Sequence, residues 1–317
     1  MDRRTQTTRR TALKGIAGTF IAGGALASAG TAAAAGDWRV AETPTDRDLY
    51  DVAYTDAGTF AVGGGGDVLR RSDAGWTRVL DGGPTGNGNT LYGADVSDDG
   101  ERLWFVGGSG AIGEYDVTTG SLTDHSAPND VTNNFNDVNV VGPAGEENVY
   151  VAGDSGKIYY SFDAGETFDQ VTPGSGSAVN ALDFHADRAG NAVDGNQTVF
   201  ATDDGGTYDR IGIENANVNF HAVDSDGADE VYVAGGGGTV YDWNGTEWTP
   251  TDLGDATLRD VEIDGGAGLT VGGGGKVFEL ADGAWTQLDT PTGANLNAVV
   301  RGPTDVAVGA SGTVIER

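Results

Sequence analysis

A glycine-containing turn motif recurs along most of the chain and constrains its fold more than any other feature. The motif reads Gly-x-x-Gly followed, two residues later, by Val or Ile, and six intact copies are present. A seventh, degenerate copy has Asp194 and Gln197 where the glycines would be. The aliphatic residues that end the copies are 37 to 46 residues apart, and they are Val68, Ile112, Ile158, Val199, Val240, Val277 and Val314. This period predicts a repeat architecture of seven similar units.

Each unit has the pattern of four short β-strands. In the first unit, residues 49–52 and 59–62 precede the glycine turn, residues 68–70 follow it, and residues 76–79 come after an Asp/Gly turn. Short β-rich runs separated by Gly, Asn and Asp are typical of antiparallel hairpins. No helical periodicity is found beyond the first 35 residues. Four strands in roughly 40 residues are the size of one propeller blade.

The two ends of the repeat region complement each other. The last unit stops after its third strand, at residues 313–316, and a lone fourth strand stands at residues 38–40. This N-terminal strand can complete the last blade, which closes the ring and hides strand edges that an open array would expose. We therefore predict an all-β fold: a seven-bladed β-propeller over residues 36–317, with four antiparallel strands per blade and the ring closed by the N-terminal strand.

Residues 1–35 have the features of a twin-arginine-type signal peptide. Arg9 and Arg10 precede an uncharged stretch rich in Gly and Ala, which ends in four alanines that fit an A-x-A cleavage site. The alternative is a retained membrane anchor, because residues 15–35 are long enough to span a bilayer. The Gly and Ala content favours the cleaved signal, so we expect a secreted or cell-envelope protein without a stable membrane span.

The charge of the chain is strongly negative. The first 35 residues hold five basic residues and one acidic residue, so the remaining 282 carry 13 basic and 47 acidic residues, a formal charge of −34. One interpretation is a surface that attracts a cationic ligand; the other, which we favour, is a carboxylate-coated surface adapted to molar salt, where long-range attraction is screened. Nucleic acid binding is not expected, because the necessary basic patch is missing.

Several turns resemble a known structural element. Residues 161–168, Ser-Phe-Asp-Ala-Gly-Glu-Thr-Phe, resemble an Asp-box, and shortened versions occur at residues 72–76 and 202–208. This element belongs to bacterial neuraminidase repeats, and the whole unit is similar to the photosystem II stability and assembly factor propellers. The resemblance covers nearly all of residues 38–317. It implies a turn in which the Asp caps backbone amides and the aromatic residue packs between blades, and it says little about function.

The familiar catalytic and metal-binding patterns are absent from the sequence. A sialidase-like site needs three arginines around one carboxylate, and only Arg259 stands where we expect the central funnel. The three histidines fall in different units and cysteine is absent, so we expect neither zinc nor disulfides. Residues 224–227 and 98–100 look like fragments of calcium loops but lack the full spacing, so we interpret them as plain turns. We expect no catalytic residues, no metal and no cofactor.

One position stands out when the units are aligned on their first strands. It is preceded by an apolar residue in every unit, and it falls where the innermost strand begins, at the mouth of a propeller funnel. The seven residues at this position, called here the ring residues, are Tyr50, Tyr92, Asn136, Asn180, His221, Arg259 and Asn297. They could bind a ligand or partner, or the Asn and Tyr side chains could satisfy backbone groups between blades. For the three Asn residues both interpretations stay open, and for His221 and Arg259 we favour binding.

These features predict an exported, non-catalytic propeller that binds a protein or peptide of the cell envelope as a scaffold or assembly factor. The alternative is an extracellular carbohydrate-binding or glycoside-hydrolysing propeller of sialidase-like type. We expect a monomer.

Overall fold

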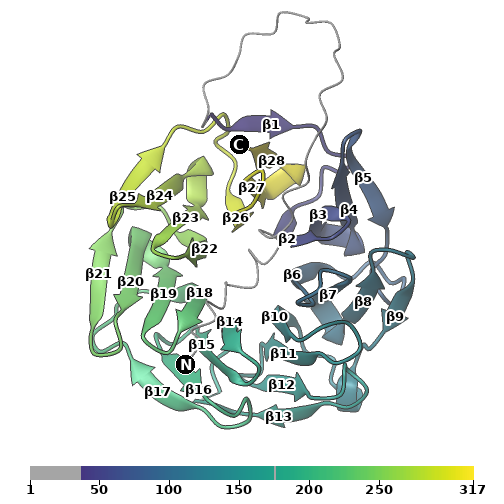
Figure 1. The fold of residues 1–317 in the computed structure, drawn as a ribbon, viewed down its shortest axis with the longest axis horizontal. Helices are drawn as coiled ribbons and strands as arrows, with labels where there is room; N and C mark the ends of the chain where they lie inside the picture. The colour runs from purple at the N-terminus through teal and green to yellow at the C-terminus, as the bar shows by residue number, and fades with distance from the viewer. Residues whose placement is uncertain (1–36, 175) are drawn as a thin grey trace, which may run out of the picture.

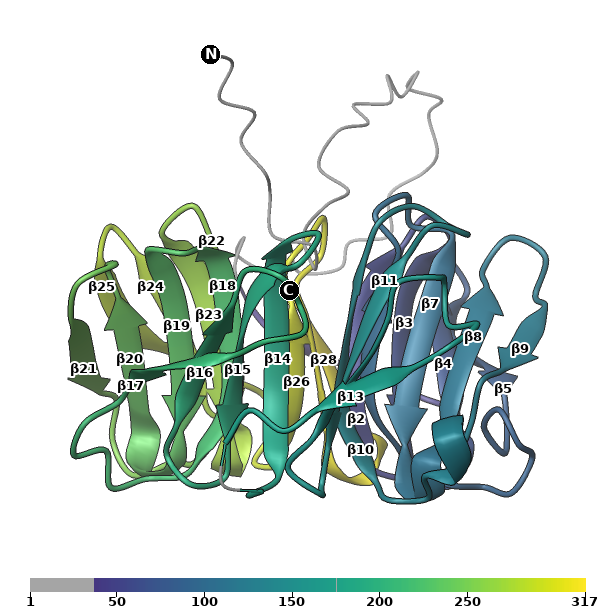
Figure 2. The ribbon, with the colours of Figure 1, turned by 90° about the horizontal axis from the view of Figure 1, so that it is seen from below.

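A computed structural model describes residues 37–174 and 176–317 of the chain. They form seven four-stranded antiparallel sheets arranged as blades around a central axis (Figure 1), which confirms the predicted seven-bladed propeller. Seen from the side, the blades make a ring whose strands run across its thickness (Figure 2). No α-helix occurs among the described residues, and none of their helices is long and apolar enough to cross a membrane. The predicted signal peptide, residues 1–35, lies outside the described residues.

Every blade places its strands in chain order from the axis outward, except that the outermost strand of the last blade is β1, the first strand of the chain. The innermost strands are β2 (Leu49–Thr55), β6 (Leu91–Val96), β10 (Phe135–Val141), β14 (Val179–Ala186), β18 (Phe220–Gly227), β22 (Leu258–Asp264) and β26 (Leu296–Val300). The second strands are β3 (Gly58–Gly63), β7 (Arg102–Gly107), β11 (Asn148–Gly153), β15 (Ala189–Asp194), β19 (Glu230–Gly235), β23 (Ala267–Gly272) and β27 (Val306–Gly309).

The outer half of each blade is shorter and more exposed. The third strands are β4 (Val68–Ser72), β8 (Ile112–Asp116), β12 (Ile158–Ser161), β16 (Val199–Thr202), β20 (Thr239–Trp243), β24 (Val277–Ala281) and β28 (Val314–Glu316). The outermost strands are β5 (Gly75–Leu80), β9 (Leu122–Asp124), β13 (Asp169–Val171), β17 (Asp209–Gly212), β21 (Trp248–Asp252), β25 (Ala284–Leu288) and β1 (Arg39–Ala41). Blades are numbered 1 to 7 below, starting from β2.

The glycine motif forms the connection between the second and third strands. In five blades it is a single 3₁₀ turn, and these turns are η2 (Gly64–Gly66), η3 (Gly108–Gly110), η5 (Gly236–Gly238), η6 (Gly273–Gly275) and η7 (Ala310–Gly312). One further 3₁₀ turn, η4 (Pro128–Asp130), follows β9 and is not part of the motif. A Cβ on Gly63 would lie 2.4 Å from the carbonyl oxygen of Asp48. Gly66 has a φ of +73°, and its Cβ would lie 2.2 Å from the nitrogen of Gly83. Both glycines are therefore required, one by close packing and one also by its left-handed backbone.

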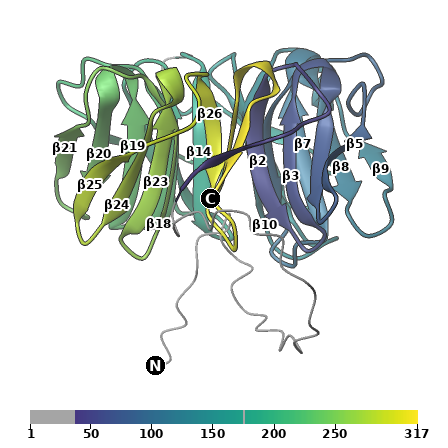
Figure 3. The ribbon, with the colours of Figure 1, turned by 90° about the horizontal axis from the view of Figure 1, so that it is seen from above.

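The N-terminal strand closes the ring as predicted. β1 pairs with β28, so that Arg39 lies opposite Glu316 and Ala41 opposite Val314. The chain then crosses from the last blade to the first (Figure 3). Trp38, just before the strand, is only 5% exposed and packs with Leu269 of blade 6 and other buried residues. The strand begins one residue later than predicted, at Arg39, and the Trp38 side chain is buried between blades 6 and 7.

Seven hydrophobic clusters fill the seven interfaces between neighbouring blades. Two turn aromatics contribute to them: Phe168 packs between blades 2 and 3, and Trp76 between blades 7 and 1. In the turn of residues 161–168, Asp163 accepts hydrogen bonds from the backbone N–H of Thr167 (2.9 Å) and from its hydroxyl (2.6 Å). Each blade thus depends on its neighbours for burial of its apolar faces, as expected for a repeat protein.

Six aspartates, five of them buried, join the innermost strands of neighbouring blades. Asp137 of blade 3, for example, accepts a hydrogen bond from its own neighbour Val138 (2.9 Å) and another from the backbone N–H of Leu182 in blade 4 (3.0 Å). The same kind of bond to the next blade occurs at six of the seven junctions, through Asp51, Asp95, Asp137, Asp183, Asp224 and Asp260.

The junction between blades 7 and 1 is held differently. Glu316 of β28 accepts hydrogen bonds from Arg71 Nε (2.7 Å) and from the indole N–H of Trp76 (2.8 Å). The two partners belong to blade 1, so the last strand of the chain is tied across the seam by a charge-assisted contact.

Candidate functional site

The seven ring residues converge on one hollow at the centre of the propeller, called here the funnel. Its volume is about 90 Å³, and Asp51, Asp137 and Asp260 also line it. The residues come from seven different strands, each being the second residue of an innermost strand. The alignment of the units therefore identified a set of side chains that are neighbours in space. Arg259 is the one arginine among the residues that line the funnel.

A β-bulge places each ring residue. In all seven innermost strands, the register with the second strand shifts between the residue before the ring position and the residue after it. In blade 1, Leu49 pairs with Gly63 and Asp51 pairs with Val62, so Tyr50 has no partner in the ladder. A bulge of this kind re-aims the extra side chain. The sequence pattern showed the repeat but not the bulge, because a bulge depends on pairing with the neighbouring strand.

The three ring asparagines hold neighbouring blades together. Asn136 Nδ2 donates to the carbonyl of Val179 (2.9 Å), and Asn180 Nδ2 donates to the carbonyl of Phe220 (2.6 Å). Asn297 Nδ2 donates to the carbonyl of Leu49 (2.7 Å), across the junction where the ring closes. In each case the acceptor is the residue that precedes the ring position of the next blade. The sequence left open whether these amides bind a ligand or satisfy backbone groups between blades. In the structure their N–H groups bond to backbone carbonyls of the next blade.

The other four ring residues keep polar atoms available. Tyr50 and Tyr92 pack edge to face, with ring centroids 5.2 Å apart. Within the described chain, their hydroxyls and the imidazole of His221 have no hydrogen-bond partner. Arg259 is exposed and donates one hydrogen bond, from Nη1 to Asn297 Oδ1 (3.2 Å). The tyrosines belong to blades 1 and 2, and the other two residues to blades 5 and 6 on the opposite side of the ring (Figure 1).

Arg259 carries the exposed charge of the ring. Burial, and then the charge of Arg259, lower the pKa of His221, so its imidazole is neutral at neutral pH. Burial raises the pKa of Tyr50, which keeps the phenol protonated. The three aspartates below are at most 7% exposed, and their oxygens accept backbone N–H groups. A group entering the funnel therefore meets one guanidinium, two phenols and one neutral imidazole, beside the amides of the three asparagines.

The acidic segments considered for calcium have other roles. Asp99 accepts hydrogen bonds from Ser97 and from the backbone of Glu101 and Ala144, as expected of a turn. The sequence pattern indicates a turn at residues 224–227, but these residues form the end of strand β18, and Asp224 is buried between blades 5 and 6. The interpretation was wrong because a pattern rich in Asp and Gly resembles a turn until strand pairing is known. Over the residues that the structure describes, no group of three or more His, Cys, Asp or Glu is arranged to hold a metal.

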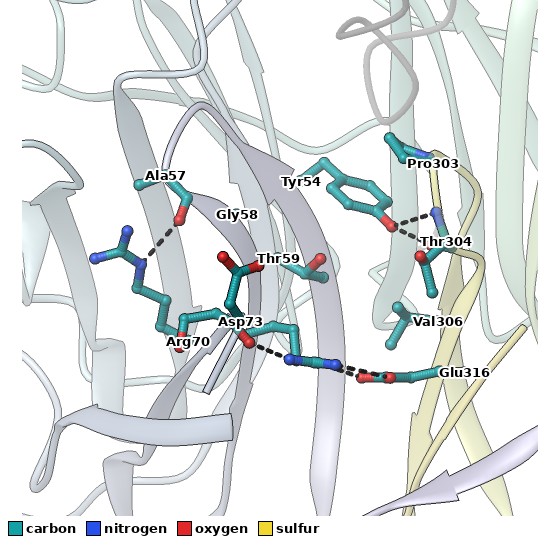
Figure 4. Close-up of a pocket in the computed structure, with 12 residues that line it drawn as sticks. Tyr54, Ala57, Gly58, Thr59, Arg70, Asp73, Pro303, Thr304, Val306 and Glu316 are labelled. Carbon is teal, nitrogen blue, oxygen red and sulfur yellow. Dashed lines mark hydrogen bonds and ion pairs between the residues drawn. The ribbon is translucent and has the colours of Figure 1, made fainter. Parts of the chain in front are cut away.

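A larger hollow lies on the seam between blades 7 and 1. It has a volume of about 650 Å³, and its lining includes Tyr54, Arg70, Asp73 and Glu316. Figure 4 shows that several of its polar groups are already engaged: the Tyr54 hydroxyl meets the backbone of Thr304, and Arg70 Nε donates to the carbonyl of Ala57. The contact of Tyr54 with Thr304 joins blade 1 to blade 7. The funnel collects side chains from all seven blades, so it is the stronger candidate for a binding site.

Comparison with known proteins finds the fold but no family. No protein family and no curated protein matches the sequence. Solved structures are similar over most of their length. A catalytically inactive virginiamycin B lyase from Staphylococcus aureus, with quinupristin, is 15% identical with a TM-score of 0.77, covering 88% of this chain and 98% of its own.

Two further solved structures are also similar to this chain. YCF48 bound to D1 peptide is 15% identical with a TM-score of 0.70, covering 89% of this chain and 94% of its own. The WD40 repeats of RRP9 are 13% identical with a TM-score of 0.72, covering 89% and 97%. At such identities the likeness shows the propeller fold alone.

Proposed function

We propose that the protein is a non-catalytic binding scaffold or assembly factor that holds a protein or peptide segment in the funnel. The observation that carries the proposal is the set of seven bulges, which aim seven side chains from seven blades at one point. Four of these side chains, Tyr50, Tyr92, His221 and Arg259, present hydrogen-bonding atoms to whatever enters. Bulges that re-aim side chains are enriched next to functional sites.

The size of the funnel favours a polypeptide over a whole small molecule or sugar. Sites that enclose a drug-sized ligand have volumes of roughly 300–1,000 Å³, whereas the funnel has about 90 Å³. A space of this size admits the tip of a side chain or one end of a chain, while the remainder of a partner rests outside. Arg259 is suited to a carboxylate or carbonyl oxygen of that partner, since a guanidinium offers paired donors. The Tyr50–Tyr92 pair offers apolar faces beside it.

The comparisons and the N-terminal sequence support this proposal from two sides. YCF48, whose structure was solved with D1 peptide, shows that a propeller of this fold can hold a peptide. The twin-arginine-like sequence of residues 1–35 supports export, and we infer that the protein acts as a monomer in the cell envelope or outside the cell.

The proposal is tested by the double substitution His221→Ala and Arg259→Ala. Both side chains lie at the solvent-facing mouth, so the melting temperature should change little. Affinity for the partner, measured by its recovery from an envelope extract, should fall by about tenfold or more, since a hydrogen bond to a charged group contributes about 1.5–3 kcal/mol. Arg39→Ala, which removes an exposed arginine from the outer strand β1, is the matched control and should leave recovery unchanged. Equal recovery by wild type and double variant, with equal melting curves, would place the binding site elsewhere.

A further inference from the structure

A third hollow lies on the outer rim between blades 4 and 5, and it is called here the rim groove. Its volume is about 690 Å³, and its lining includes Arg210, Ile211, Glu214, Trp243, Glu247 and Trp248. It is formed between the outermost strand of blade 4, β17, and the outer hairpin of blade 5, β20 and β21, which neighbour each other on the rim (Figures 1 and 2). It is therefore separate from the funnel and several times larger.

Two tryptophans form the wall of the rim groove. Trp243 and Trp248 are partners across the β20–β21 hairpin, with ring centroids 5.2 Å apart and planes at 37°. Both indole N–H groups are bonded to backbone carbonyls, Trp243 to Ala228 (3.2 Å) and Trp248 to Ile211 (3.0 Å). Both side chains are half-buried. The rings are thus held in fixed orientations before any ligand arrives, which lowers the entropy cost of binding.

The equivalent positions in other blades show that Trp243 is not required by the fold. The partner of Trp76 in blade 1 is Arg71, and the partner of Trp285 in blade 6 is Leu280. In the hollow beside Trp76, Glu316 accepts hydrogen bonds from both Arg71 and the indole N–H, so that site is filled by its own ion pair. In blade 5 the same position holds a second tryptophan instead.

The polar groups around the two tryptophans are unused. Within the described part of the chain, the side chains of Arg210, Glu214 and Glu247 form neither ion pairs nor hydrogen bonds. Arg210 and Glu214 come from one side of the groove and Glu247 from the other. Carboxylates only accept hydrogen bonds and a guanidinium only donates them. The groove therefore combines apolar aromatic surface with donors and acceptors on both sides.

We propose that the rim groove is a carbohydrate-binding site. A pyranose ring has an apolar face of C–H groups, which gains from burial against an indole. Its hydroxyls both donate and accept hydrogen bonds, so one sugar can use the acceptors Glu214 and Glu247 together with the donor Arg210. A volume of about 690 Å³ lies in the usual range for a ligand pocket, roughly 300–1,000 Å³.

Two other ligand classes fit the groove less well. A proline-rich segment would cover the indoles but has few N–H donors, so it would leave both glutamates desolvated without partners. A cationic group would suit the indoles and the glutamates, but Arg210 lies in the same groove and would repel it. An uncharged molecule rich in hydroxyls meets every group present. The site is independent of the funnel, so it can be tested without reference to the funnel's partner.

The test is titration of the full chain with cellohexaose, chitohexaose and mannohexaose. Binding is measured by calorimetry and by tryptophan fluorescence. We expect at least one hexasaccharide to bind with a Kd between micromolar and millimolar. Trp243→Leu gives blade 5 the Leu–Trp pair that blade 6 already contains, so the variant should fold normally. It should weaken binding by about tenfold or more, as removal of a central aromatic anchor does. Trp285→Leu removes a tryptophan from the matching hairpin of blade 6 and should leave binding within about twofold.

Three outcomes would overturn the proposal. The first is that none of the three hexasaccharides binds the wild-type chain. The second is that one binds equally well to wild type and to Trp243→Leu, which would place the sugar elsewhere. The third is that decaproline binds in a Trp243-dependent manner and the sugars do not, which would make the groove a peptide site.

Discussion

Arg259 donates a hydrogen bond from Nη1 to Asn297 Oδ1 at 3.2 Å, while the Nδ2 of the same asparagine donates to the carbonyl of Leu49. One amide therefore connects blades 6, 7 and 1 and orients the one arginine of the funnel. The second bond crosses the junction where the ring closes. The position of the proposed binding group thus depends on closure of the propeller, which links the stability of the fold to its function.

Closure can be tested through Trp38. This side chain is 5% exposed and fills the interface between blades 6 and 7. Trp38→Ala should lower the free energy of unfolding by about 3–5 kcal/mol, as truncation of a buried tryptophan usually does. Val40→Ala, in the same strand but 59% exposed, should change it by less than about 0.5 kcal/mol. Denaturant unfolding of both variants checks the prediction, and equal stability would mean that β1 does not close the ring.

The aspartate junctions predict a second set of stability effects. Asp137→Ala would leave the backbone N–H groups of Val138 and Leu182 buried without acceptors. Each unsatisfied group costs about 1–3 kcal/mol, so the expected loss is about 2–6 kcal/mol. Asp289→Ala, at an exposed residue just after β25, is the control for loss of one negative charge. A loss from Asp137→Ala no larger than that of the control would show that the bonds between inner strands contribute little.

Strand geometry explains why the sequence predicted some of these features and not others. The glycine turns marked six of the seven blades, because close contacts such as that of Gly63 with Asp48 admit no side chain, and the period between the turns located the seventh. Alignment then predicted the ring residues. Their division into bonded asparagines and available groups could not be predicted, because the acceptors, such as Leu49 for Asn297, lie in other blades. The rim groove was missed for the same reason: its two walls come from different repeats.

The acidic interior of blade 5 predicts a specific pH dependence. Burial, with Glu230, Asp183 and Asp264 nearby, raises the pKa of Asp226 from 3.8 to about 7. The folded state then holds more protons than the unfolded state between these values, so this group lowers stability as pH rises from 3.8 to about 7. Asp226→Asn should therefore match wild type below this range and be more stable above it. Melting curves across the range, with exposed Asp169→Asn as control, check this; a constant difference at every pH would contradict it.

The net charge predicts a strong effect of salt. With a formal charge of −34 over residues 36–317, mutual repulsion of carboxylates should destabilise the fold in dilute buffer. Raising KCl from about 0.1 M to about 1 M shortens the Debye length from about 10 Å to about 3 Å. The melting temperature should rise steeply over this range. A midpoint that does not move would contradict the halophilic interpretation of the surface.

The central claim, that the funnel holds a polypeptide partner, is tested most directly by photo-crosslinking from inside it. The residue p-benzoylphenylalanine is placed at Tyr92, whose hydroxyl has no partner within the described chain. The control carries it at Phe162, which is 37% exposed on the surface. On irradiation in an envelope extract, the crosslinker at position 92 should give a defined protein adduct. This adduct should be lost when His221→Ala and Arg259→Ala are also present, and the crosslinker at position 162 should not form it. An adduct from Phe162 and none from Tyr92 would contradict the account.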